Sequence, residues 1–225
     1  MPFHQVSGIL LAVIRWPVAF AALALLPAAA MALYAEILVS WKVLQGLFAG
    51  AAAYGVFWWW QVRHWSVDWF STLEHELTHC LFAWLTGNRV TGLRVTLRQG
   101  GHMKFLGTGN WLIALAPYFF PTLTVLCLVL TLVVPFFSGT YAQGIVGVTL
   151  AYHLTSTWTE THHAQTDLRE AGFLFCWMFL PTANVASLGV MLAAVRSGQF
   201  GVLQWFKALA VSPWFPKAIF SWMAS

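Results

Sequence analysis

Six long apolar runs constrain this chain more than any other feature of its sequence. Each is about as long as the roughly 20 mostly apolar residues that a helix needs to cross a bilayer. The runs lie at residues 17–40, 43–62, 66–86, 109–135, 141–161 and 172–195. Only 8% of the residues are charged, against roughly 25% in an ordinary soluble domain. We therefore predict an all-α polytopic membrane protein with about six transmembrane helices.

The chain reads as a single integral-membrane domain over residues 1–225, because no linker or repeat divides it. Its core is predicted at about 66–180, after an N-terminal anchor at about 1–62 that opens with an amphipathic piece at 3–16. Trp and Phe mixed with lysines at about 197–225 predict an interfacial segment. The net charge of +4 is scattered, so nucleic acid is not an expected partner. We expect the protein in a lipid bilayer, the bacterial inner membrane.

One segment between the runs has the pattern of strands. In residues 89–105, apolar Val95 and Leu97, then Met103 and Phe105, alternate with polar residues around Gly100-Gly101. This predicts a membrane-associated β-hairpin after the third run. Since open strand edges cannot face lipid, the hairpin must lie on protein or line a watery cavity.

The third run, 66–86, contains four ionisable residues within six positions: Glu74, His75, Glu76 and His79. A charged group inside a span costs about 2.5–3.5 kcal/mol on insertion scales, so such a cluster needs a functional reason. Helical spacing places His75 and His79 on one face, one turn apart, where both can bind one metal ion. The metal lowers the pKa of water from about 16 toward 7, and the adjacent Glu76 can take its proton. This is the HExxH arrangement of zinc hydrolases.

A catalytic zinc ion usually has three protein ligands and one open position. The richest source of a third ligand is the stretch 151–172, which holds His153, Glu160, His162, His163, Asp167 and Glu170. Asp167 lies just before the last long apolar run, on the same side of the membrane as the hairpin. His79 is about 12 Å from the hairpin end of its own helix. Asp167 would therefore need an inward-set loop or a partly unwound helix. The residues alone leave the ligand open between Asp167, Glu160 and a histidine of 153–163.

The order of these elements resembles the site-2 protease family of intramembrane metalloproteases, in its short, compact branch. The resemblance covers about residues 66–180. It rests on "HELTHCLFAWLTGNRV", the glycine-containing hairpin, "GNWLIALAPYFFP" and an Asp near a later span. "HELTH" is similar to the family's HE-x-GH form, with Thr78 in place of glycine. In well-studied members the Asp lies in an Asn-Pro…Asp-Gly context, whereas Leu168 follows Asp167 here.

The resemblance implies one zinc ion bound by His75, His79 and Asp167, with Glu76 as the general base. The implied function is that of a zinc-dependent intramembrane endopeptidase acting on a membrane-bound protein. The alternative is a non-proteolytic zinc-binding membrane protein, either a transporter or a hydrolase of lipids or small molecules.

The hairpin has a role in this interpretation, because a bare strand edge can hold an extended substrate segment. We predict substrate contacts at Val95, Leu97, Asn110 and His153. Prolines at 117 and 121 should break or kink the fourth run, and such a kink would open a water path.

Overall fold

A computed structural model of the chain describes residues 1–64, 69–96, 100–133 and 139–212. Most of these residues are helical, and the two strands form one antiparallel sheet. The elements are α1 (Phe3–Ser40), α2 (Gln45–His64), α3 (Trp69–Leu85), β1 (Arg89–Thr96), β2 (Gly100–Leu106), α4 (Trp111–Leu115), the 3-10 turn η1 (Ala116–Tyr118), α5 (Thr122–Val133), α6 (Gly139–Glu160), α7 (Thr166–Ala171) and α8 (Phe173–Val211). The prediction of a helical protein with a hairpin after the HExxH helix is confirmed.

Two helices in the described part of the chain, α1 and α8, are long and apolar enough to cross a membrane. A third span is added if the bent pair Trp111–Tyr118 and Thr122–Thr131 counts as one broken helix. The other three predicted spans correspond to α2, α3 and α6, which do not pass the same test of length and composition. The prediction of six spans is therefore not confirmed.

The N-terminal region differs from the prediction in one respect. The amphipathic piece expected at 3–16 is not separate but forms the first part of α1, which continues through Pro17 and Pro27. A proline removes one helical hydrogen bond, but the continuous apolar sequence on both sides favours keeping the helix. The N-terminal end of α1 thus belongs to the same continuous helix as the part that packs along α8.

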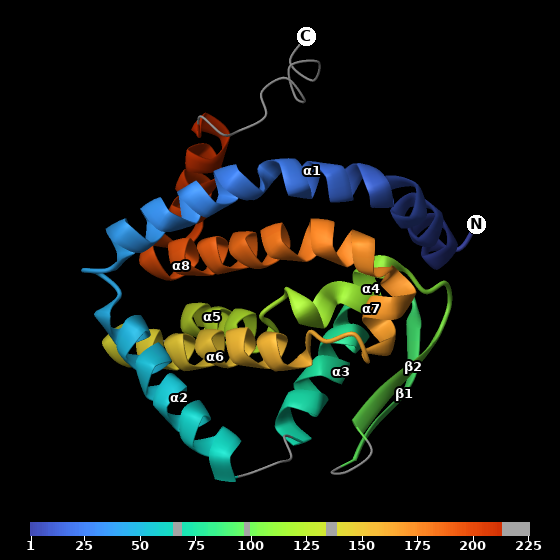
Figure 1. Ribbon diagram of the computed structural model, residues 1–225, viewed down its shortest axis with the longest axis horizontal. Helices are drawn as coiled ribbons and strands as arrows, with labels where there is room; N and C mark the ends of the chain where they lie inside the picture. The colour runs from blue at the N-terminus through green and yellow to red at the C-terminus, as the bar shows by residue number, and fades with distance from the viewer. Residues whose placement is uncertain (65–68, 97–99, 134–138, 213–225) are drawn as a thin grey trace.

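The helices pack in two main pairs, α1 along α8 and α2 along α6, and α5 lies beside α6 (Figure 1). Small residues make the second pair close: a side chain at Gly50 or Gly147 would overlap the backbone of the opposite helix. Such close backbone approach is typical of helix association in membranes. A buried ion pair joins the first pair, with Arg196 Nε 2.7 Å from Glu36 Oε1.

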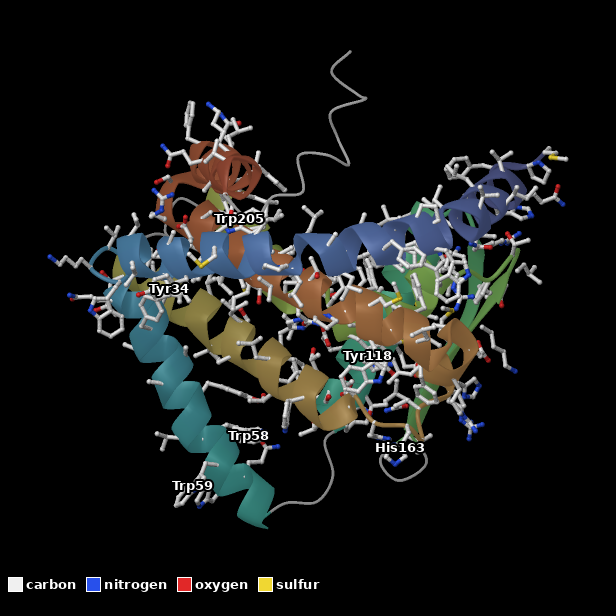
Figure 2. All side chains as sticks on the ribbon, turned by 45° about the horizontal axis from the view of Figure 1, so that its top comes forward. Tyr34, Trp58, Trp59, Tyr118, His163 and Trp205 are labelled. Atoms are coloured by element: carbon white, nitrogen blue, oxygen red, sulfur yellow. The ribbon has the colours of Figure 1, made fainter. Side chains whose placement is uncertain are left out.

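The C-terminal segment continues α8 past a kink, with non-helical angles at Ser197 and Gly198, as far as Val211. Trp205 is buried in this part of the chain, packed on Ala32 and Ala193 (Figure 2). The described part of the predicted interfacial segment therefore packs at least partly on protein. Residues 213–225 lie outside the described residues.

The fourth apolar run is broken, as its prolines predict. Between α4 and α5 the chain bends by 75° through η1, which contains Pro117. Asn184 of α8 secures the bend, because its Nδ2 donates to the carbonyl of Tyr118 at 2.9 Å. The bend leaves Tyr118 fully buried inside the bundle (Figure 2).

Candidate metal centre

Helix α3 presents the HExxH residues to the protein interior. His75, Glu76 and His79 are all buried, and the two imidazole rings lie one turn apart with centroids separated by 4.8 Å. Thr78, on another face of the helix, is fully buried and its Oγ1 lies 2.6 Å from Thr122 Oγ1 at the start of α5. The residue that replaces glycine in the HE-x-GH form thus anchors α3 to its neighbour.

Helix α7 brings Asp167 to the same place. It is a short helix set between α6 and α8, and its apolar residues Leu168 and Ala171 are buried against Phe175. Arg15 of α1 donates to the carbonyl of Ala171 at the end of α7, and its guanidinium lies 4.9 Å from the centroid of the Phe175 ring. A packed short helix therefore provides the inward-set segment that the sequence required for Asp167.

The three side chains converge on one point. Asp167 Oδ2 lies 3.5 Å from His75 Nε2 and 3.4 Å from His79 Nε2. These distances exceed the 2.9–3.0 Å typical of N–H···O hydrogen bonds. They match co-ligands of one zinc ion, since bonds of about 2.0–2.1 Å at tetrahedral angles separate the ligand atoms by about 3.3–3.4 Å. The ligand atoms of all three residues lie within 4.8 Å of one another, so the donor set fits zinc.

The remaining ring nitrogens are held by other groups. His79 Nδ1 lies 2.8 Å from the carbonyl oxygen of Ile113, and His75 Nδ1 lies 2.6 Å from Glu160 Oε2. A carbonyl oxygen only accepts, so His79 Nδ1 must carry a proton, and Nε2 is the ring nitrogen left to bind a metal ion. Histidine ligands of metals in proteins are oriented in this way.

Asp167 is suited to act as an anionic ligand. Burial raises the pKa of its carboxyl, but the neighbouring imidazoles of His75 and His79 outweigh burial and hold the pKa well below its usual range. Tyr118 also donates its hydroxyl to Asp167 Oδ2 at 3.3 Å. The carboxylate is therefore ionised at neutral pH, and it is positioned by the two histidines and by Tyr118.

A cavity of about 870 Å³ adjoins these side chains. His75, Glu76, His79 and Asp167 all line it, together with residues of α1, α4 and β2. Figure 1 shows α3, α4, α7 and the hairpin gathered at one end of the molecule. Glu76 thus reaches the same open space as the three candidate ligands, which leaves room for a water molecule and a substrate.

The hairpin differs from the prediction in detail. The hairpin was predicted around Gly100-Gly101, and these two glycines are the first residues of β2, paired with Thr96 and Val95. Among the described residues that line the cavity, the hairpin contributes only residues of β2. Val95 belongs to β1, and Leu97 lies outside the described residues. The strand beside the cavity is therefore β2, whose second edge has no partner strand in the described sheet.

The other predicted site residues lie in different surroundings. Asn110 lines the cavity, and its Oδ1 accepts from the N–H of Ile113 at 3.0 Å. Its Nδ2 is buried and makes no hydrogen bond to the described residues. His153 is buried on α6 and is not among the described cavity-lining residues. His162 and His163 are exposed, and Figure 2 shows His163 at the surface.

Sequence reasoning missed several groups that shape the site. The carbonyl of Ile113 and the hydroxyl of Tyr118 carry no sequence signal, because each depends on the bend between α4 and α5. Gly101 had a signal in the Gly-Gly pair around which the hairpin was predicted, but the pattern does not show that β2 approaches α3 there. A Cβ at Gly101 would lie 2.7 Å from Glu76 Cγ and 2.9 Å from a methyl carbon of Thr72. The absence of a side chain at Gly101 lets β2 approach Glu76.

Gly101→Ala is expected to lower any activity that depends on Glu76 by at least about tenfold, because a small misplacement of a reacting group is costly. Zinc content should not change. Gly92→Ala in β1 is the matched control, since a Cβ there meets only Lys104 Cβ at 3.9 Å. The measurements are the catalytic rate and the amount of bound zinc for both purified variants. Equal rates in the two variants would contradict this role of Gly101.

Comparison with known proteins supports the site-2 protease resemblance. A profile of the Peptidase M50B-like family matches residues 47–212, which include the HExxH helix, the hairpin and Asp167. Searches of curated proteins and of solved structures gave no match. The family match covers well over half of the chain, and the chain has apolar helices long enough to span a bilayer. The chain therefore belongs to the Peptidase M50B-like family of membrane metallopeptidases, within the site-2 protease family.

Proposed function

We propose that this protein is a zinc-dependent intramembrane endopeptidase that cleaves a peptide bond of a membrane-bound protein. The observation that carries the proposal is the convergence of His75, His79 and Asp167 beside a cavity that Glu76 also lines. We infer that it acts in the bacterial inner membrane, which would supply both lipid and substrate.

In this proposal the metal ligands and Glu76 have separate roles. His75, His79 and Asp167 hold the zinc ion. When bound, zinc polarises the scissile carbonyl and lowers the pKa of the attacking water. Glu76 takes the proton of that water and passes it to the leaving amine, as a general base and then a general acid. Burial of these side chains strengthens their electrostatic interactions.

The cavity suggests how substrate binds. A helical segment hides its peptide bonds in its own hydrogen bonds, so a substrate must be extended to be cut. Strand addition to the free edge of β2 would hold a substrate segment open beside Glu76. Asn110 supports the same arrangement, because its buried Nδ2 is available to donate to a substrate carbonyl. We therefore assign substrate binding to β2 and Asn110 rather than to Val95.

Metal removal tests the proposal directly. Protein purified in detergent should contain about one zinc ion per chain. It should cleave a model single-span protein whose helix is interrupted by Gly-Pro. A chelator should abolish cleavage, because the water then loses its activation, and added zinc should restore it. A protein that remains free of metal when zinc is supplied would refute the proposed function.

Disulfide trapping tests the substrate strand. His102 of β2 lines the cavity and pairs with Arg94 of β1, and both side chains are exposed. In an inactive background without the native cysteines, His102→Cys is expected to cross-link a cysteine near the scissile bond of the model substrate. Arg94→Cys is the matched control and should cross-link several-fold less, because no described residue of β1 lines the cavity. Preferential cross-linking at Arg94→Cys would place the substrate on β1 instead.

A further inference from the structure

Glu160 is not one of the three candidate zinc ligands, but it makes two contacts with α3. It is the last residue of α6, and its side chain reaches across to α3. Glu160 Oε2 lies 2.6 Å from His75 Nδ1, and Ser71 Oγ donates to Glu160 Oε1. Ser71 and His75 are one helical turn apart and therefore share a face. One carboxylate thus uses both oxygens on two side chains of the same helix.

The geometry separates Glu160 from the candidate ligands. Its carboxylate lies at Nδ1 of His75, whereas Asp167 lies 3.5 Å from Nε2 of the same ring. The two nitrogens of an imidazole point away from each other. A carboxylate bound at Nδ1 therefore cannot reach an ion bound at Nε2 without leaving its present contact. Glu160, which the sequence offered as an alternative ligand, is in this structure a partner of a ligand.

Resting on the proposed function, we propose that Glu160 is a positioning residue for zinc binding, acting through His75 with Ser71 as its support. An ionised carboxylate only accepts, so it keeps the proton of His75 on Nδ1 and leaves the Nε2 lone pair for the metal. A charge-assisted hydrogen bond also makes the ligand more basic than a neutral one does.

The two histidines are therefore held differently. His79 donates to the neutral carbonyl of Ile113 at 2.8 Å, while His75 donates to a carboxylate. The orientation of the His75 ring depends on a side chain, which can be replaced by mutation. The orientation of the His79 ring depends on a backbone carbonyl, which cannot. It follows that substitution at Glu160 can weaken zinc binding without altering any ligand.

The test measures zinc affinity by competition with a fluorescent chelator in purified wild type, Glu160→Ala, Glu160→Gln and the control Glu170→Ala. Glu160→Ala should lose about 10–100-fold in affinity, the usual effect of removing such a partner. Glu160→Gln should lose about fivefold or less, because glutamine keeps an acceptor for Nδ1–H but not the charge. Glu170→Ala should match wild type in zinc affinity, because Glu170 is exposed on α7 and lines the cavity, but His75 and His79 form their ion pairs with Glu160 and Asp167.

The outcomes separate this inference from the proposed function. Wild-type protein that takes up no zinc would refute both. Wild-type binding with unchanged affinity in Glu160→Ala would refute the positioning role alone. An equal, large loss in Glu160→Gln and Glu160→Ala would instead show that Glu160 is a direct ligand, because the amide is a poor substitute for a coordinating carboxylate.

A measurement on the wild type keeps the inference testable if Glu160→Ala does not fold. In zinc-loaded protein with ¹⁵N-labelled histidine, NMR should show His75 with a protonated Nδ1 and a metal-bound Nε2. The Nδ1–H resonance should shift in Glu160→Gln, and the corresponding resonance of His79 should not. Metal bound at Nδ1 of His75, or a resonance insensitive to Glu160→Gln, would overturn the assignment.

Discussion

Replacing Glu76 by glutamine is expected to abolish peptide-bond cleavage while one zinc ion remains bound per chain. Glutamine has nearly the same shape as glutamate but cannot take a proton from water. Loss of a general base lowers rates by about 10²–10⁴-fold. The His75, His79 and Asp167 side chains are untouched, so zinc affinity should stay close to that of the wild type. Cleavage of the model single-span substrate and the zinc content of the same sample are the measurements.

Glu74→Gln is the matched control for this experiment. Glu74 precedes the motif on the same helix and is equally buried, but its side chain lies near Thr78 and it does not line the cavity among the described residues. Its substitution should leave the cleavage rate within a few-fold of wild type. Full activity in Glu76→Gln would remove the peptidase mechanism and favour a transporter, for which this glutamate has no chemical role.

Asp167→Ala is expected to weaken zinc binding by more than about 100-fold, beyond the range for loss of a supporting partner. The reason is geometric: Asp167 Oδ2 lies 3.4–3.5 Å from both imidazole Nε2 atoms, at co-ligand distances. With two histidines remaining, the site falls below the three protein ligands of a catalytic zinc centre. Cleavage should therefore disappear at zinc concentrations that saturate the wild type.

Glu170→Ala again serves as the control, because it removes a carboxylate from the same short helix. Comparing the zinc affinities of Asp167→Ala and Glu160→Ala decides which of the two residues is the third ligand, a choice that the sequence left open. If Asp167→Ala keeps wild-type affinity and Glu160→Ala loses it by more than 100-fold, Glu160 is the third ligand and α7 has no place in the metal centre.

The spacing of residues close together in the sequence determined the HExxH helix, the two strands and the break in the fourth apolar run. Helical periodicity alone places His75 and His79, which are four residues apart, on one face, with Glu76 next to the first of them. The structure has this helix as α3. The alternation before and after Gly100 predicted two strands, and the prolines at 117 and 121 predicted the break between α4 and α5. Each of these features depends on residues within one or two turns of one another, so an isolated segment contains the information.

Tertiary structure alone decided the rest. Asp167 is 88 residues after His79 in the chain, and only the packing of α7 against α4 and α8, with Arg15 at its end, brings the two side chains together. The same holds for Glu160, which reaches Nδ1 of His75 rather than Nε2, and for the choice of β2 over β1 at the cavity. The prediction of six spans is not confirmed for a related reason, since apolar composition makes a segment fit for lipid and for the protein interior alike. Which side of a ring, strand or helix meets a partner depends on contacts between distant segments, and residue order does not encode those contacts locally.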